Sequence, residues 1–376
     1  MRRLLPLLVL VALTGCLGGG DDDRDDGSSP GGGADAATLG FPGTATKNTT
    51  RVESAEPAQA AAAIARAVYP GSRPEAVVLA DGENWQAALT ASVLAGSPMR
   101  APVLLSDGAE MPEATRAALE ALRPTGSPDA GGAQVIRVGD VPRPEGLKAA
   151  DVIAPTPEET ARAMDTFAST AAGRPSRTVI VTTSERPEIA MVAAGWAARS
   201  ASPILFASRD ALPEVTRLAL RGHSRPRIYL LGGEDVLGKA VEAGLAKLGR
   251  VTRVAGTDAT TTSIAAARLR DGAAGWAVDD PGHGLVFASQ RRPLDAVAAA
   301  PLSNAGSYGP LLVLPADGSV PTPLREYLLD IQPGYGENPV RGVYNHAWIV
   351  GDRTAVPLAT QSAIDDLLEI SPIRSQ

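Results

Sequence analysis

One order of secondary-structure patterns occurs three times along this chain of 376 residues. Each copy has an Ala-rich helical pattern, a β-branched strand, a second helical pattern, a proline-led strand and an apolar run that ends in glycine. The leading prolines, Pro102, Pro203 and Pro310, are almost evenly spaced. A period of roughly 100 residues indicates a repeated domain rather than a solenoid of short repeats.

The strands of each copy are short and rich in Val, Ile and Leu. Such runs, when they alternate with helices, are typical of a parallel sheet buried on both faces. Proline is tolerated at the first residue of a strand, which need not donate to the sheet. The sequence therefore predicts an α/β protein of three tandem doubly wound parallel-sheet units. We expect Leu104, Leu205 and Leu312 to be buried in equivalent strands.

The N-terminus has the pattern of a bacterial lipoprotein signal. Arg2 and Arg3 precede an apolar run, residues 4–13, that is too short to cross the roughly 30 Å hydrocarbon core of a membrane. The run leads to Leu-Thr-Gly-Cys, which resembles a lipobox and ends at Cys16, the single cysteine. The resemblance implies cleavage after residue 15 and a diacylglyceryl group on Cys16. An ordinary secretory signal with a chance cysteine is the alternative.

The segment after Cys16 is mostly Gly, Asp, Ser, Thr and Ala. It cannot bury enough apolar surface to offset the entropy of ordering, so residues 16–47 are predicted to be a disordered tether. The mature body is thus expected on the extracellular face of the membrane, held there by the lipid on Cys16.

The charge balance limits the partners. The formal net charge is −7, which argues against sequence-independent nucleic-acid binding, and only 4% of the residues are aromatic. An acidic body also has no bulk attraction for an anionic polymer, so any such binding needs local sites.

The repeats resemble the cell wall-binding repeat 2 family of Gram-positive surface proteins, which carries three tandem copies. The third copy matches best, with an Arg-led opening at 252–258, an Asp-Ala helix at 295–302 and a Pro-Leu-Leu strand within 309–312. The resemblance implies a pseudo-threefold arrangement and non-covalent attachment to anionic wall polymers. The predicted repeat units are residues 48–146, 147–248 and 249–376.

The chain departs from the family pattern at one charged position. The family's second arginine is replaced by Pro57, Glu158 and Ala259 in the three copies. This loss weakens the expectation of binding to teichoic-acid-type polymers and leaves the fold prediction unchanged.

No catalytic, cofactor or metal motif is complete. Residues 233–240 resemble a phosphate loop, but Ala240 replaces the hydroxyl that would hold Mg²⁺, and Glu234 and Asp235 repel phosphate. The three histidines lack the spacing of zinc ligands. The sequence therefore predicts a protein that is not an enzyme and uses no cofactor or metal.

The loops after the first strand of each copy are the candidate binding sites, because parallel sheets collect ligands at the carboxyl ends of their strands. They are residues 81–84, 183–186 and 289–292. Arg291 and Arg292 are the best candidates for an anion contact, followed by Arg51 and Arg253 at the opening of two copies. Solvated loops, and a structural ion pair for Arg51 and Arg253, are the alternatives.

These features predict a lipid-anchored, wall-associated surface protein whose repeats bind a wall polymer non-covalently or act as a scaffold. The alternative is a solute-binding lipoprotein of a transporter. Such proteins have two lobes, whereas this chain has three comparable units and few aromatic residues for a ligand pocket.

Overall fold

The computed structural model describes residues 45–373 except residue 273 and residues 305–308, so Cys16 and most of the predicted tether lie outside it. Within these residues the chain forms three four-stranded sheets, and every strand pair in them is parallel. The prediction of an α/β protein built from tandem parallel-sheet units is confirmed.

The three sheets share one strand order. Sheet one has the order β3 (Val103–Ser106), β2 (Val77–Asp81), β4 (Val135–Val138), β5 (Ala149–Val152). Sheet two has the order β7 (Ile204–Ala207), β6 (Thr178–Thr183), β8 (Arg227–Leu231), β9 (Arg250–Val254). Sheet three has the order β11 (Leu311–Leu314), β10 (Gly284–Ser289), β13 (His346–Val350), β1 (Thr49–Val52). Below, units one, two and three are these sheets with the helices that connect their strands.

The proline-led strands β3, β7 and β11 occupy the same edge of their sheets. Each leading proline lies just before its strand, and its carbonyl accepts a hydrogen bond from the neighbouring strand, as in Val78 N–H to Pro102 O at 2.9 Å. The ring nitrogen has no hydrogen to donate and is not needed there. Leu104, Leu205 and Leu312 are fully buried in these equivalent strands, as predicted.

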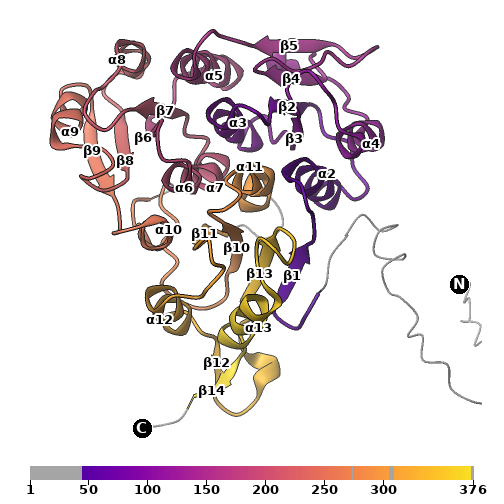
Figure 1. The fold of residues 1–376 in the computed structure, drawn as a ribbon, viewed down its shortest axis with the longest axis vertical. Helices are drawn as coiled ribbons and strands as arrows, with labels where there is room; N and C mark the ends of the chain where they lie inside the picture. Colours follow the sequence, from indigo (N-terminus) through magenta and orange to yellow (C-terminus); the bar gives the residue numbers. More distant parts are fainter. Residues whose placement is uncertain (1–44, 273, 305–308, 374–376) are drawn as a thin grey trace, which may run out of the picture.

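The fourth strand of each sheet comes from the start of the next sequence repeat. β5 and β9 leave repeats two and three to complete sheets one and two, and β1, from the start of the described chain, completes sheet three beside β13. The sequence repeats that begin at residues 48, 147 and 249 therefore do not coincide with the sheets. The exchange links the three units into a closed ring (Figure 1).

Helices follow the strands and cover both faces of the sheets. They are α2 (Pro57–Val68), α3 (Trp85–Ala91), α4 (Glu113–Leu122), α5 (Pro157–Ala171), α6 (Pro187–Ala190), α7 (Val192–Ser200), α8 (Glu214–Arg221), α9 (Lys239–Ala246), α10 (Ala259–Arg268), α11 (Leu294–Ala299), α12 (Thr322–Asp330) and α13 (Leu358–Leu367). Short 3₁₀ segments are η1 (Ser92–Ala95), η2 (Pro128–Ala130), η3 (Ala300–Ser303) and η4 (Pro339–Arg341), and β12 (Gly334–Tyr335) pairs with β14 (Ser371–Pro372). None of the described helices is long and apolar enough to cross a membrane.

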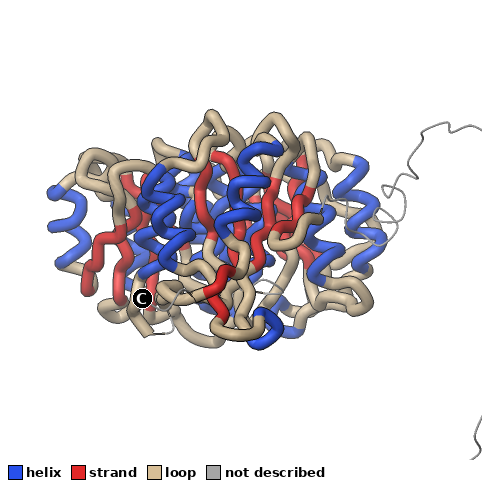
Figure 2. The backbone as a smooth tube through the Cα atoms, turned by 90° about the horizontal axis from the view of Figure 1, so that it is seen from below, coloured by secondary structure: helices blue, strands red, loops and turns tan. Residues whose placement is uncertain are grey.

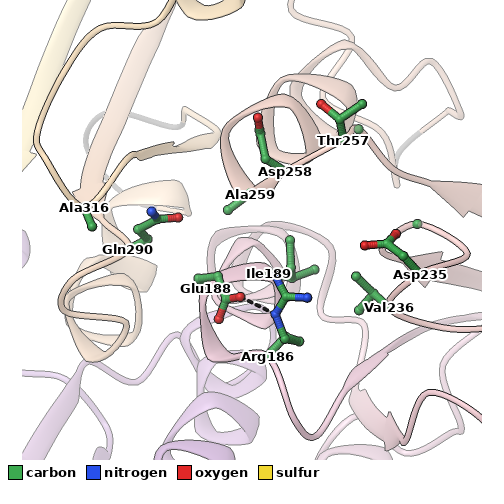
Figure 3. Close-up of a pocket in the computed structure, with 12 residues that line it drawn as sticks. Arg186, Glu188, Ile189, Asp235, Val236, Thr257, Asp258, Ala259, Gln290 and Ala316 are labelled. Carbon is green, nitrogen blue, oxygen red and sulfur yellow. Dashed lines mark hydrogen bonds and ion pairs between the residues drawn. The ribbon is translucent and has the colours of Figure 1, made fainter.

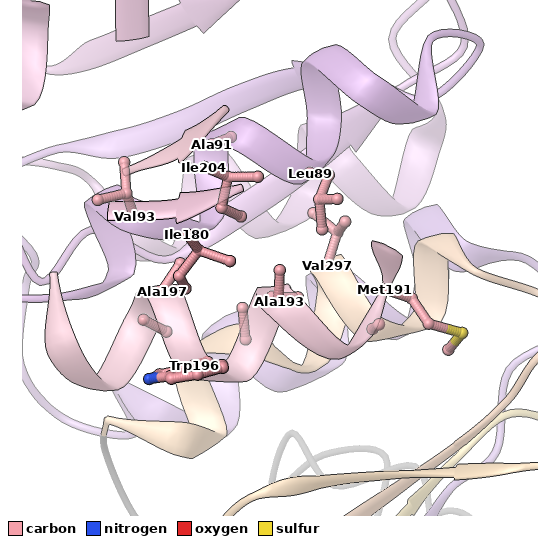
Figure 4. Packing of buried hydrophobic residues seen from close by; sticks show 14 of the residues in the cluster. Leu89, Ala91, Val93, Ile180, Met191, Ala193, Trp196, Ala197, Ile204 and Val297 are labelled. Carbon is pink, nitrogen blue, oxygen red and sulfur yellow. The ribbon is translucent and has the colours of Figure 1, made fainter. Parts of the chain in front are cut away.

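The equivalent helices α3, α7 and α11 meet at the centre of the ring, where small side chains allow close packing (Figure 4). Leu89, Ala193 and Val297 lie against one another from the three units and are buried. A Cβ at Gly195 of α7 would approach Ser303 Oγ to 2.6 Å, so a larger residue there would have to displace this hydroxyl from its hydrogen bond to Gly309 O. The small residues of α3, α7 and α11 thus allow this central contact.

The strands run across the thickness of a flattened body (Figure 2). Their carboxyl ends bring the loops of different units together on one face, where Gln86 Nε2 donates to Ser184 O at 3.2 Å. At the start of the described chain, just before β1, Asn48 N–H donates to Asp365 Oδ1 of α13 at 2.8 Å, and Lys47 pairs with Glu369. Thr46 Oγ1 also donates to Asp365 Oδ1 at 2.5 Å, so the last residues of the predicted tether, Thr46 and Lys47, contact α13 and the residues just after it rather than being disordered.

A buried ion pair lies in unit two. His223 Nε2 lies 2.9 Å from Asp165 Oδ2, and His223 Nδ1 lies 2.8 Å from Ser176 O. Burial lowers the pKa of His223, but the hydrogen bond to Asp165, the Asp165 charge and the Ser176 carbonyl outweigh this, so the pKa is raised above 6.5. With an acceptor at each ring nitrogen, the doubly protonated imidazolium fits this site best.

Substituting aspartate for Leu104, Leu205 or Leu312 should lower the free energy of unfolding by about 4 kcal/mol or more, because the buried carboxylate would have no partner. Leu358→Asp, at an exposed position in the first turn of α13, is the control and should cost little. Urea unfolding of each variant measures the difference. Equal, small effects at all four positions would contradict the assignment of these strands to the core.

The Asp165–His223 pair should make stability fall at alkaline pH. The folded protein binds the His223 proton more tightly than the unfolded chain, so the stabilisation is complete below pH 6.5 and is lost as pH rises through the raised pKa. Urea unfolding between about pH 5 and pH 9 should show this decline for the parent and a flatter profile for His223→Gln. Parallel profiles for the two proteins would rule out the linkage.

Candidate functional site: two polar cavities between loops and helices

Arg51 lies in the core rather than on a binding face. Its side chain is 0% exposed; Nε donates to Gln361 Oε1 at 2.7 Å, and Nη1 donates to Gly351 O at 2.9 Å and Asp352 O at 3.1 Å. Burial lowers the pKa of its guanidinium. These bonds fasten β1 to the residues after β13 and to α13, a structural role made by hydrogen bonds rather than by the ion pair considered as the alternative.

Arg253 occupies the same strand position in sheet two. Its Nη1 donates to Gly232 O at 2.7 Å, and its Nη2 donates to Glu242 Oε2 at 2.7 Å. Like Arg51, it satisfies a carbonyl at the end of the adjacent strand. In sheet one the position is Asp151, which pairs with Arg137 of β4 at 2.8 Å.

Arg291 and Arg292 differ in their surroundings. Arg291 is exposed and donates from Nε at 3.0 Å and Nη2 at 2.7 Å to Ala316 O. Arg292 is only 14% exposed and donates from Nη1 to Ser54 O at 2.9 Å and Ala55 O at 2.7 Å. Arg292 therefore joins unit three to the segment before α2, and Arg291 is the exposed member of the four predicted arginines.

A buried carboxyl group, Asp295, completes the Arg292 contact. Arg292 Nη2 donates to Asp295 Oδ1 at 2.8 Å, and Asp295 is 0% exposed. Burial raises the pKa of Asp295 to about 6, although the neighbouring Arg292 favours the charged form. This aspartate stands at the start of the helix motif that resembles the family pattern.

The first cavity, which we call the arginine groove, lies in unit one between α4 and the connection from β4 to β5. It has a volume of about 750 Å³, an apolar floor that includes Met111, Leu119 and Leu147, and four exposed arginines. The arginines are Arg73, Arg116, Arg123 and Arg143.

The charges of the arginine groove are only partly paired. Two of its arginines are neutralised in part, since Arg143 pairs with Asp151 at 2.5 Å and Arg116 lies 3.9 Å from Glu113. Among the described residues, no carboxylate pairs with Arg73 or Arg123. Glu120 and Glu145 also line the groove but pair with neither of these two arginines, so Arg73 and Arg123 present cationic groups that no carboxylate contacts in the described structure.

Sequence reasoning missed the arginine groove. Its charges come from the segment before β2, from α4 and from the loop after β4, and none of these is one of the three predicted binding loops, residues 81–84, 183–186 and 289–292. The four arginines share no motif, and spacing alone does not show that they meet.

The second cavity, which we call the junction pocket, lies between units two and three and has a volume of about 390 Å³ (Figure 3). Its floor is formed by Ile189, Val236 and Ala259, and charged side chains surround it. Those charged residues are Arg186, Glu188, Asp235 and Asp258. Gln290 and Ala316 reach it from unit three, so the pocket is close to Arg291.

Local structure fixes the charges of the junction pocket. Arg186 pairs with Glu188 two residues further on, at the start of α6. Asp258 caps α10 by accepting from Thr261 N–H at 2.7 Å, which already satisfies one of the free amides of the helix end. Three carboxylates face one guanidinium here, so the pocket suits hydroxyl or ammonium donors and disfavours anions.

The sequence identified part of the junction pocket. Arg186 belongs to a predicted binding loop, and Asp235 to the turn that resembles a phosphate loop. Glu188 and Asp258 were missed, because a helix-start Glu and an N-cap Asp are ordinary features of a helix.

Comparison with known proteins bears on the fold. No family model matches the sequence, and no curated protein matches it. Among solved structures, Cwp6 from Clostridium difficile is similar with a TM-score of 0.68 and 19% identity over 84% of this chain and 48% of that chain. Cwp8 from the same organism is similar with a TM-score of 0.67 and 18% identity over 86% of this chain and 52% of that chain. The chain thus spans about half the length of each and shares with both the ring of three parallel-sheet units.

Proposed function

We propose that this protein is a lipid-anchored surface protein that binds an anionic polymer of the bacterial cell wall without covalent attachment. Two observations support the proposal: its fold is similar to the cell wall proteins Cwp6 and Cwp8, and it carries the arginine groove. The three-unit ring does not resemble the two-lobed body expected of a transporter's solute-binding lipoprotein.

The arginine groove is the observation that carries the polymer contact. A protein with a net charge of −7 repels a polyanion at long range, so attraction must come from charges within about 8–10 Å of the bound polymer, the range over which salt leaves exposed charges effective. Arg73 donates from Nε to Arg123 O at 2.6 Å, and its terminal nitrogens and the Arg123 guanidinium remain as donors that suit phosphate or carboxylate groups. The apolar floor can contact the carbon skeleton of a repeating unit.

The anchor is proposed at Cys16, on the lipobox-like sequence. A flexible coil of the length of residues 17–46 has a mean span of about 30 Å, which would hold the body near the outer surface of the membrane. From this position the exposed groove of unit one would reach the inner part of the wall.

The first test removes the unpaired charges of the groove. The double variant Arg73→Gln/Arg123→Gln should co-sediment with purified walls at least about tenfold more weakly, because a hydrogen bond to a charged group contributes about 1.5–3 kcal/mol. Arg325→Gln/Arg341→Gln changes the net charge equally at exposed positions in unit three and should bind as the parent does.

Walls stripped of anionic polymers by acid form the second arm of this test, and the parent should no longer bind them. Arg291→Gln tests the strand-end loop separately. Undiminished binding by the groove variant would move the contact elsewhere, and a parent that fails to bind intact walls would favour a scaffold for another protein.

The anchor is tested by Cys16→Ser. The variant should leave the membrane fraction, since the apolar run before Cys16 is short and removable and the body is acidic. Fractionation with immunoblotting measures how the variant divides between membrane and soluble fractions. Its electrophoretic mobility shows whether the signal is still cleaved. Membrane retention of the cleaved variant would contradict lipid attachment at Cys16.

A further inference from the structure

The junction pocket has an equivalent elsewhere in the ring where the same position is filled. At the contact between unit three and the start of the described chain, Arg292 donates to the carbonyls of Ser54 and Ala55, just before α2. The guanidinium is held there by Asp295, and Asp352 lies 3.8 Å from it. A cationic donor therefore closes this junction from within the chain.

Strand register identifies the equivalent residues. Thr183 and Ser289 lie opposite the last residues of β7 and β11, so Arg186, three residues further on, is the counterpart of Arg292. Val254 likewise matches Val52, since each pairs with the residue that precedes a strand-end glycine.

The segments after these valines correspond in turn. Gly256 and Thr257 are the counterparts of Ser54 and Ala55, two and three residues after the matching valines. Both line the junction pocket. By this equivalence, the carbonyls of Gly256 and Thr257 should point to the place in the junction pocket that corresponds to the Arg292 guanidinium. In the described part of the chain, no donor bonds to either carbonyl.

Three substitutions explain why Arg186 does not fill the pocket. Asp295 corresponds to Ile189 and Asp352 to Gly233, so Arg186 has lost both carboxylates that hold Arg292 in place. Glu188, in place of Leu294, pairs with Arg186 instead. The cavity is the space that the arginine leaves, ringed by acceptors.

We propose that the junction pocket binds the free primary ammonium group of an amino sugar. The ammonium would take the place of the missing guanidinium, donating to the carbonyls of Gly256 and Thr257 and to the Asp235 carboxylate, while the sugar ring lies on the apolar floor. The volume of about 390 Å³ falls within the range of small-ligand sites. The ammonium rests on this geometry alone, and the choice of a saccharide as its carrier rests on the proposed wall-binding function.

The test titrates the whole protein with small probes. Calorimetry should detect glucosamine, with at least tenfold weaker binding of N-acetylglucosamine and of glucose, which lack the charged donor. Methylammonium should bind more weakly than glucosamine because it has no ring to place on the floor. Equal binding of glucosamine and N-acetylglucosamine, or no binding of glucosamine, would overturn the proposal.

Two variants locate the site. Glu188→Leu/Ile189→Asp restores two of the three residues of unit three, including the carboxylate that holds Arg292, so Arg186 should turn to the carbonyls, close the pocket and abolish glucosamine binding. Asp235→Asn alters an exposed residue, should fold normally and should weaken glucosamine binding about tenfold, while Asp129→Asn, an exposed control in unit one, should not. Full glucosamine binding by both pocket variants would place the site elsewhere.

The proposal can fail separately from wall binding. The groove variant Arg73→Gln/Arg123→Gln should bind glucosamine as the parent does, and the parent should bind glucosamine even if it does not sediment with walls. If the parent binds walls but not glucosamine, the proposed ammonium site in the junction pocket is wrong, and the proposal of wall binding through the arginine groove still stands.

Discussion

The pairing of β1 with β13 is the contact on which the rest of the structure depends. It brings the start of the folded chain to the last sheet and closes three separate units into a ring. Arg51 reinforces the pairing with three hydrogen bonds in a fully buried position, where leaving the strand-end carbonyls unpaired would cost about 1–3 kcal/mol each. These prearranged acceptors offset part of the cost of burying the guanidinium.

One repeated scaffold supports different electrostatics in each unit. The strand-end position of Arg51 is Arg253 in sheet two and Asp151 in sheet one. Arg253 and Asp151 each pair with a side chain of opposite charge, whereas Arg51 donates to the Gln361 amide and to two backbone carbonyls. Likewise, Arg292 fills the junction between unit three and the start of the described chain. Its counterpart Arg186 does not fill the junction between units two and three, where the junction pocket remains. Triplication thus preserves the backbone and frees individual side chains to form unlike surfaces.

The fold was largely predictable because it depends on a repeated pattern of apolar runs, and the burial of Leu104, Leu205 and Leu312 followed from their common place after proline. The exchange of the fourth strand was not predictable, since the sequence does not say which sheet a short strand such as Thr49–Val52 will join. The site was predicted less well: an arginine at the end of a strand is as suitable for a backbone carbonyl as for a ligand. Only the structure shows that Arg292 is used in the first way.

The ring closure also determines where mechanical load would enter the molecule. Under the proposed anchorage, tension between membrane and wall would pass along the tether to Asn48 and the contacts it makes with α13, and then to β1. β1 is an edge strand, so it can be drawn off without disturbing β10 and β11. Its release would remove the strand pairing that joins the start of the chain to sheet three, while the helix contacts at the centre of the ring and at least three strands of every sheet stayed in place. Under tension, β1 is therefore expected to detach first.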